Sequence, residues 1–338
     1  MELYLDSIKF EEVEEANKLG IIAGLTTTPT FLYKEGITDF DAAIVKLSRM
    51  VKILHVEALG DTAEDIVKEA KRLLSLGLDK SKTVFKIPVS EEGVKACKIL
   101  TDEGMMVNLH LIYTLQQAYM AFSAGATYAC VLVGRMQDQG QDALTLVEQC
   151  VKAVERFNYP TKIMFSSVRH VEHVRNSLNL GAHVCTIPWK VLKQLPQNHF
   201  TDIGIKQFVD HTQLLTIKAG EIARTENIKL NYNATILEAL EMMTKSKLGS
   251  IIIQDDKGEI FRIFTDGDLR RHIEGGLKDV IHTKLSELKP NTPVTVTSDL
   301  TLMELTKIFK ENKVDNVIVM ENNLPFGIVD IQDIIKWI

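Results

Sequence analysis

The sequence predicts an α/β chain in two parts: a closed (β/α)8 TIM barrel, followed by a smaller α+β unit. Three observations predict it. The 338 residues exceed what one core usually holds, so we expect two domains. Short apolar segments alternate with helical segments through the first two thirds of the chain, which is typical of parallel α/β folds. The remaining third holds two copies of one motif.

The barrel prediction depends on the apolar or β-branched segments that read as strands. They are residues 2–6, 21–26, 53–59, 83–89, 105–112, 127–133, 162–168 and 183–188. Several of the helical segments between them end at a glycine, among them Gly77 and Gly125. Eight such units in roughly 215 residues fit a closed barrel better than an open sheet.

The pattern changes after Pro188, and residues 194–230 look helical. An internal repeat begins near Tyr232, and each copy predicts a helix, a strand, a tight polar turn, a second strand and the start of a helix. The expected divisions are a barrel at 1–217, a helical linker at 218–230 and a repeat unit at 231–338, with its copies at 231–288 and 289–338.

Composition limits the partners. The chain is 45% hydrophobic and 25% charged, which is ordinary for a soluble protein, and its formal net charge is -6. It has no long basic run and no apolar run long enough to span a bilayer, so we expect neither nucleic acid nor membrane as a partner. The four cysteines lie in apolar segments without metal-ligand spacing, which predicts reduced thiols in the cytoplasm and no metal site.

Lys86 is the most informative single residue, because it lies between Phe85 and Ile87 in an apolar strand. Burial disfavours the charged form of an amine, which lowers its pKa and makes it nucleophilic. The alternative is a structural lysine that pairs with a carboxylate inside the barrel.

Other polar residues lie near the ends of the predicted strands, and in a barrel these ends converge on one mouth. They are Asp6, Thr26, Thr27, Thr28, Glu57, Asn108, His110 and Ser167, with Arg135 and Arg169 just after strands six and seven. A pair of arginines suits phosphate recognition, whereas carboxylates and histidine suit proton transfer. The sequence therefore predicts one cavity that combines an amine, proton carriers and a phosphate site.

Residues 1–217 resemble the small transaldolase and fructose-6-phosphate aldolase family. The motifs that carry the resemblance are MELYLD at 1–6, AGLTTTP at 23–29, TVFKIPV at 83–89, GRMQDQG at 134–140 and SSVR at 166–169. They follow the family's order and spacing over the whole segment. The resemblance implies a class I aldolase type of barrel that needs no cofactor for catalysis.

The resemblance also implies roles for particular residues. Lys86 would form the Schiff base, and Asp6 would assist carbon–carbon bond breaking as an acid or base. Arg135, Ser167 and Arg169 would hold the phosphate of the substrate. Further candidate substrate contacts are Thr27, Thr28 and Asn108.

The chain departs from the family pattern at several of these positions. Thr28 replaces an asparagine that helps to position the substrate, and Leu132 replaces an aromatic residue. Glu57 fits the glutamate of typical transaldolases, where the aldolase branch has glutamine, and thus favours transaldolase chemistry. These departures suggest a changed substrate, a changed reaction or a lost activity.

His110 replaces a threonine that holds a catalytic water in the family. Histidine exchanges protons near neutral pH, so we expect His110 to act directly as a general acid or base, with Glu57 orienting it. The alternative is a histidine that fills a layer of the barrel.

The two C-terminal copies resemble CBS modules, which form pairs also called Bateman domains. The segment RIFTDGDLRRHI at 262–273 resembles those attached to arabinose-5-phosphate isomerases. The resemblance implies that Thr265 and Asp268 contact the ribose of an adenine nucleotide. Arg262 stands at the usual glycine, where it could contact a phosphate or block the cleft.

The second copy keeps Gly327 and Asp333 but has Asp330 where threonine is expected. We therefore expect one intact and one altered nucleotide site. The alternative is that the pair only dimerises the chain.

Taken together, the sequence predicts a cytoplasmic, homo-oligomeric transaldolase- or aldolase-like enzyme that acts on a phosphorylated ketose, with an adenine nucleotide as possible effector. A different Schiff-base reaction, such as an isomerisation or dehydration, is a second possibility. The rival is an inactive barrel that serves as a nucleotide-responsive sugar-phosphate-binding protein, for example in surface-glycan precursor synthesis.

Overall fold

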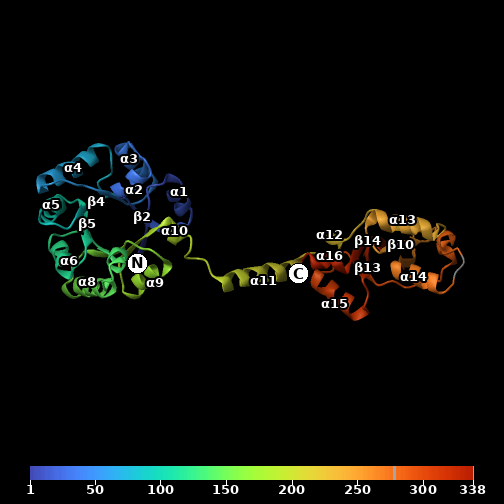
Figure 1. Cartoon of the computed structure of the whole chain (residues 1–338). Helices are drawn as coiled ribbons and strands as arrows, with labels where there is room; N and C mark the ends of the chain where they lie inside the picture. The colour runs from blue at the N-terminus through green and yellow to red at the C-terminus, as the bar shows by residue number, and fades with distance from the viewer. Residues whose placement is uncertain (277–278, 338) are drawn as a thin grey trace. The chain divides into compact units, whose positions relative to one another are not determined.

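The structure is a computed structural model that describes residues 1–276 and 279–337 (Figure 1). The chain divides into two compact units, Met1–Gln197 and Asn198–Ile338. Each has its own buried cores, and we describe each by itself.

The first unit is a closed barrel of eight parallel strands in sequence order, which confirms the predicted fold class. The strands are β1 (Glu2–Asp6), β2 (Ile22–Thr26), β3 (Leu54–Glu57), β4 (Thr83–Pro88), β5 (Met106–Ile112), β6 (Tyr128–Leu132), β7 (Lys162–Ser166) and β8 (Val184–Pro188). The barrel closes where β1 pairs with β8, with Leu3 opposite Cys185.

Helices surround the strands, as Figure 1 shows for the blue-to-green part of the chain. They are α1 (Phe10–Lys18), α2 (Pro29–Lys34), α3 (Phe40–Met50), α4 (Ala63–Ser75), α5 (Glu91–Asp102), α6 (Leu115–Ser123), α7 (Val133–Asp138), α8 (Ala143–Phe157), α9 (Val171–Asn179) and α10 (Trp189–Leu192). Side chains cap the first turns of α4, α5 and α6, from Thr62, Ser90 and Thr114. Each such cap contributes about 1 kcal/mol.

The inside of the barrel changes character along its axis. One layer is apolar and aromatic, with Tyr4, Val84, Tyr128, Met164 and Val184 packed together. Polar side chains lie toward the C-terminal ends of the strands. The apolar layer closes the barrel below the polar one, so that the polar side chains form a blind cavity rather than a pore.

The second unit contains two three-stranded sheets of similar design. The strand order of the first is β11 (Ile260–Thr265), β10 (Ser250–Gln254), β9 (Lys229–Asn231), and that of the second is β12 (Thr295–Thr297), β13 (Asn316–Glu321), β14 (Leu324–Asp330). The helices are α11 (His199–Thr216), α12 (Ala219–Ile222), α13 (Ile236–Ser246), α14 (Asp266–Glu274), α15 (Leu302–Asn312) and α16 (Ile331–Ile335), with short 3-10 helices at Val280–His282 and Leu285–Glu287.

The two repeats exchange segments. The chain before the first sheet packs on the second repeat, where Arg224 and Ile328 exchange two backbone hydrogen bonds of 2.9 and 3.0 Å. In return, Asn291 bonds both backbone groups of Ile263 in the first repeat. Ile228, Leu248, Ile252, Ile318 and Ile328 then form one core that joins the repeats.

The boundary between the two units differs from the expected one. The structure divides the chain after Gln197, whereas the sequence pattern suggested residue 217. The segment 218–230, expected to be a helical linker, contains only a four-residue helix, α12, whose Ala219 lies in the core of the second repeat. Among the described residues, no helix combines the length and apolarity needed to cross a membrane.

Candidate functional site

A cavity of about 600 Å³ lies at the C-terminal mouth of the barrel. Eight of the predicted site residues line it: Asp6, Thr28, Glu57, Lys86, His110, Arg135, Ser167 and Arg169. They come from the ends of different strands and from the loops that follow. The barrel topology therefore brings together residues that are far apart in the sequence.

Lys86 lies in the wall of this cavity and is 5% exposed. Its Nζ is 2.9 Å from Glu57 Oε1 and donates a hydrogen bond of 2.8 Å to the carbonyl oxygen of Thr27. Strand pairing explains the ion pair, because Glu57 on β3 is in register with Lys86 on β4. The lysine is thus both accessible from the cavity and paired with a carboxylate.

Glu57 also lies beside His110. His110 Nε2 is 3.1 Å from Glu57 Oε2, but the two groups are not aligned for a hydrogen bond. Burial opposes the ionisation of Glu57, but Lys86 and His110 outweigh it, and the pKa of this carboxyl is lowered. Burial likewise lowers the pKa of His110, and although Glu57 opposes this effect, Lys86 adds to it. Near neutral pH the site therefore holds an ionised Glu57 beside a mainly neutral imidazole.

A bulge in β5 accompanies His110. The register between β5 and β6 shifts between Leu109 and Ile112, and Leu111 has a φ of 59°. This left-handed conformation costs a non-glycine residue about 1 kcal/mol or more. Leu111 itself lines the cavity. Bulges of this kind occur beside active sites, where they redirect side chains.

Asp6, at the end of β1, accepts a hydrogen bond of 2.8 Å from the hydroxyl of Thr26. Thr26 in turn lies 2.5 Å from the hydroxyl of Thr186 on β8. Because the Thr26 hydrogen points at Asp6, Thr186 is the donor in the second bond. Burial raises the pKa of Asp6, against the attraction of Lys86 and the hydrogen bond from Thr26.

Arg135 and Arg169 also line the cavity, together with Ser167. Their loops approach closely at Gly134, where an added Cβ would lie 1.8 Å from the carbonyl oxygen of Ser167. Only glycine permits this contact. Arg135 donates to the hydroxyl of Tyr113 at 3.1 Å. The guanidinium groups therefore come from adjoining loops into one cavity, an arrangement that suits a dianionic phosphate.

Two predicted substrate contacts do not line the cavity. Thr27 bonds the carbonyl oxygen of His55 through its hydroxyl and supports Lys86 through its own carbonyl. Asn108 Nδ2 lies 3.0 Å from His55 Nδ1, in the layer beneath Lys86. Both side chains therefore form hydrogen bonds within the barrel and support the cavity without lining it.

Several cavity residues were not among the predicted site residues. They are Cys130, Met164, Ser166 and Thr186. Alternation along a strand could have identified Thr186, since it lies two residues before the last residue of β8. Burial raises the pKa of the Cys130 thiol to about 11, so this cysteine stays protonated.

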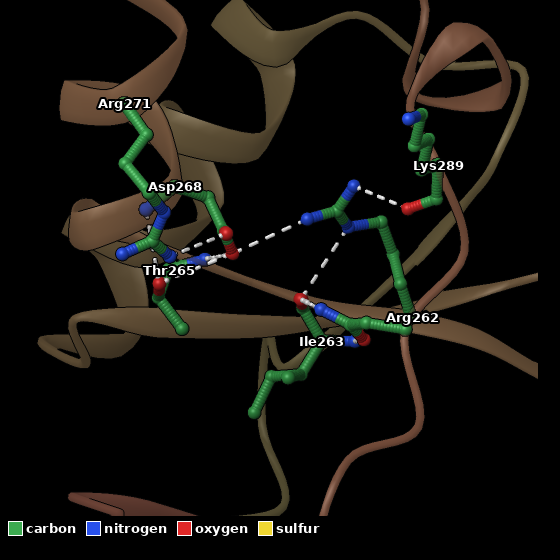
Figure 2. A network of polar contacts seen from close by, with 7 residues as sticks. Arg262, Ile263, Thr265, Asp268, Arg271 and Lys289 are labelled. Atoms are coloured by element: carbon green, nitrogen blue, oxygen red, sulfur yellow. Dashed lines mark hydrogen bonds and ion pairs between the residues drawn. The ribbon is translucent and has the colours of Figure 1, made fainter.

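The second unit places the predicted nucleotide-binding residues at the start of α14. The Thr265 hydroxyl accepts a hydrogen bond from the backbone N–H of Asp268, and the Asp268 carboxylate accepts one from the backbone N–H of Thr265, which forms a capping box. Arg262 Nη2 lies 3.3 Å from Oδ2 of the same carboxylate. Figure 2 shows this contact. Arg271 Nη2 lies 2.8 Å from the other oxygen, Oδ1. Burial opposes ionisation of Asp268, but Arg271 and Arg262 outweigh it and lower its pKa.

Arg262 is 4% exposed and also donates to the carbonyl oxygen of Lys289 at 2.8 Å. The sequence left open whether this arginine contacts a ligand or occupies the cleft. In this structure it is buried and paired with the Asp268 carboxylate.

The second copy has a similar arrangement with a different arginine. Asp333 is 5% exposed and accepts two bonds from Arg224, of 2.6 and 3.1 Å. Gly327 lets the backbone of Arg224 pack closely, because an added Cβ would lie 3.0 Å from the Arg224 carbonyl oxygen. Both predicted ribose-binding carboxylates are therefore paired with an arginine of this chain.

The fold and the cavity define a (β/α)8-barrel protein of the transaldolase type. The chain belongs to the Transaldolase/Fructose-6-phosphate aldolase family, whose model matches residues 3–245. A CBS domain model matches residues 219–275 and 285–338. These matches confirm both resemblances, and the overlap between them falls in the segment that the structure assigns to the second unit.

Similar proteins support a transaldolase-type enzyme. The chain is 38% identical over 209 residues to a probable transaldolase of Thermoanaerobacter sp., which covers 62% of this chain and 95% of that protein. It is 40% identical over 210 residues to a probable transaldolase of Methanococcus vannielii, which covers 62% of this chain and 96% of that protein.

Among solved structures, a CBS-domain containing protein from Agrobacterium tumefaciens is similar to this chain, with a TM-score of 0.33 and 22% identity. The similarity covers 36% of this chain and 93% of that one.

Proposed function

We propose that the barrel forms a Schiff base between Lys86 and the ketone of a phosphorylated ketose, and that it transfers a ketone-bearing fragment as a transaldolase. The observation that carries this proposal is the position of Lys86. Its Nζ lies between Glu57 and the carbonyl of Thr27, in the same cavity as Arg135 and Arg169.

The reaction begins when the neutral amine of Lys86 attacks the ketone carbon. The carbinolamine loses water and leaves an iminium ion, which withdraws electrons from the neighbouring bond. Asp6 takes the proton from the hydroxyl group beyond that bond, the carbon–carbon bond breaks, and an aldehyde leaves. The enamine that remains on Lys86 then adds to an acceptor aldehyde, and hydrolysis of the new iminium releases the product.

Glu57 and His110 are the proton carriers for imine formation in this proposal. Glu57 touches both Lys86 and His110, so a proton lost by the amine has a short path to the imidazole. The lowered pKa of His110 keeps it neutral and able to accept that proton. The alternative role, in which His110 shapes substrate choice, is tested below.

For the second unit we propose adenine-nucleotide binding at Asp268, with Arg262 released to contact phosphate. What supports it is the capping box of Thr265 and Asp268 beside a cationic side chain. The alternative is a pair that only joins chains into a homo-oligomer. Sedimentation of the full chain with and without ATP separates the two, because a purely structural pair shows no nucleotide bound to either species.

Borohydride trapping with a panel of sugar phosphates tests the barrel proposal. Mass spectrometry should place the reduced adduct on Lys86, and Lys86→Met should lose both adduct and activity while retaining the fold. Lys82→Met is the matched control, because Lys82 is an exposed lysine near the start of the same strand. An adduct without cleavage products would favour another Schiff-base reaction. No adduct with any reactive ketone would favour the sugar-phosphate-binding protein.

A further inference from the structure

The two cavity arginines belong to different βα connections, called loops here: the one after β6, which includes α7, and the one after β7. Arg135 lies in α7, after β6, and Arg169 precedes α9, after β7. Both side chains can contact one phosphate only if the two loops keep a fixed separation, since charge-assisted bonds depend closely on geometry. The exposed ion pair between Arg169 and Asp138, of 2.9 Å, contributes little to this, because exposed pairs are weak and a phosphate competes for the guanidinium.

A buried histidine joins the two loops. His173, in the first turn of α9, is 2% exposed. Its Nδ1 lies 3.2 Å from the backbone nitrogen of Arg169, whose N–H can only donate. Nδ1 is therefore unprotonated, and the hydrogen of the neutral ring is on Nε2. That Nε2–H donates to the side-chain oxygen of Gln137 on α7 at 2.6 Å.

His173 thus bridges the backbone beside one arginine and the helix that carries the other. Burial, together with His170 and Arg169, lowers the pKa of His173 to about 4, which keeps this tautomer neutral in ordinary buffers. The same loop is also held in an unusual conformation, because Ser167 has a φ of 59° and its carbonyl rests against Gly134. A segment in such a conformation persists only where its surroundings fix it.

We infer that His173 is a positioning residue, which holds Arg169 against α7 and so sets the spacing of the phosphate-binding arginines. It acts through Arg169 and Gln137, and it is not part of the cavity wall. The inference rests on the proposed phosphate site, but it does not depend on turnover.

Two substitutions separate the halves of the bridge. His173→Asn places a carbonyl oxygen near the position of Nδ1 and keeps an acceptor for Arg169, but it is too short to reach Gln137. His173→Gln places an amide near the position of Nε2 and keeps the bond to Gln137, but it loses the acceptor for Arg169. Val171→Ala, on the exposed side of the same helical turn, is the control.

The probe is inorganic phosphate, with its affinity for the full chain measured by calorimetry. His173→Gln should weaken phosphate binding about tenfold, as expected for one misplaced charge-assisted contact, and His173→Asn should weaken it less. Val171→Ala should leave it unchanged. In turnover, His173→Gln should raise KM for a phosphorylated ketose but not for dihydroxyacetone, and kcat should hold.

Other results overturn the inference. If His173→Gln lowers the melting temperature but binds phosphate as the parent does, the histidine is only structural. If the parent binds no phosphate at about tens of millimolar, the phosphate site itself is absent, because a weaker dissociation constant would not indicate a specific site. Borohydride trapping of dihydroxyacetone on Lys86 is independent of this outcome, so that the Schiff-base proposal and the role of His173 can fail separately.

Discussion

Glu57 is the residue that connects the groups of the cavity. Its carboxylate contacts Lys86 through one oxygen and lies beside His110 with the other. A carboxylate with a lowered pKa is a weak base, so a proton that leaves the amine through Glu57 is expected to move on to a stronger base. In the proposed reaction, the neutral imidazole of His110 is that acceptor.

The substitution His110→Thr tests this role. If His110 transfers the proton, turnover should fall by roughly 10²–10⁴-fold, the usual size of an acid–base contribution. The acidic limb of the pH–rate profile, expected below the ordinary histidine pKa, should disappear, while imine trapping on Lys86 persists. A threonine variant that is equally active, or more active on fructose 6-phosphate, would instead make His110 a specificity residue.

His55 leads to a prediction about acid stability. It is fully buried in the layer beneath Lys86, and burial, with the charge of Lys86, holds its pKa well below 6.5. A group with a lowered folded pKa binds its proton more readily when unfolded, so the stability from neutral His55 is complete above the unfolded pKa and is lost as pH falls toward the folded one. The melting temperature should therefore drop from pH 7 to pH 5. In His55→Gln this drop should be smaller, whatever the absolute stability of the variant at pH 7. If the drop in melting temperature between pH 7 and pH 5 is unchanged, His55 is not its cause.

At the scale of elements, the structure shows which parts of the site a sequence pattern can locate. The ends of the strands gave Asp6, Glu57, Lys86 and His110 correctly as cavity residues, because a parallel barrel directs all C-terminal ends to one mouth. The bulge at Leu111 has no such signal, since it depends on how β5 pairs with β6. The hydrogen bond between Asn108 and His55 also could not be predicted, because the two residues lie on different strands.

The turn between β11 and α14 carries a prediction of its own. Arg262→Gly restores the residue usual in CBS modules and removes one of the two arginines that pair with Asp268. If Arg262 only occupies the cleft, the variant should bind both adenosine and ATP more tightly than the parent. If Arg262 takes up phosphate, the variant should gain affinity for adenosine but lose affinity for ATP. Calorimetry with both ligands distinguishes the two, and Asp268→Ala should abolish binding in either case.

For the whole molecule, the main consequence of the structure is that two sets of cores share one chain. The barrel cores contain residues up to Leu192, whereas those of the second unit begin with Ala219. Units with separate cores can unfold separately. Calorimetry of the full chain should therefore show two transitions. A ketose trapped on Lys86 should raise the melting temperature of one transition, and adenine nucleotide should raise that of the other. A single transition whose melting temperature is shifted by both ligands would show that the two units unfold cooperatively.

The position of the domain boundary illustrates what the sequence could not determine. Residues 199–216 have a helical pattern and follow the last strand, so they looked like the end of the barrel. Only contacts assign them, and α11 contacts α15 of the second repeat. The pairing of Arg224 with Asp333, 109 residues later, is equally invisible in the sequence, because neither residue has a local reason to meet the other.

Arg224 has one more property, which concerns both repeats at once. While it holds Asp333, it also donates to the carbonyl oxygens of Ser246 and Lys247 at the end of α13, at 3.4 and 3.0 Å. A ribose that took Asp333 would have to displace this guanidinium, and the end of α13 would lose its donors. Ligand binding at Asp333 would thus be thermodynamically linked to the first repeat. By reciprocity, a ligand in the first repeat that changed the affinity at Asp333 would have its own affinity changed by the same factor.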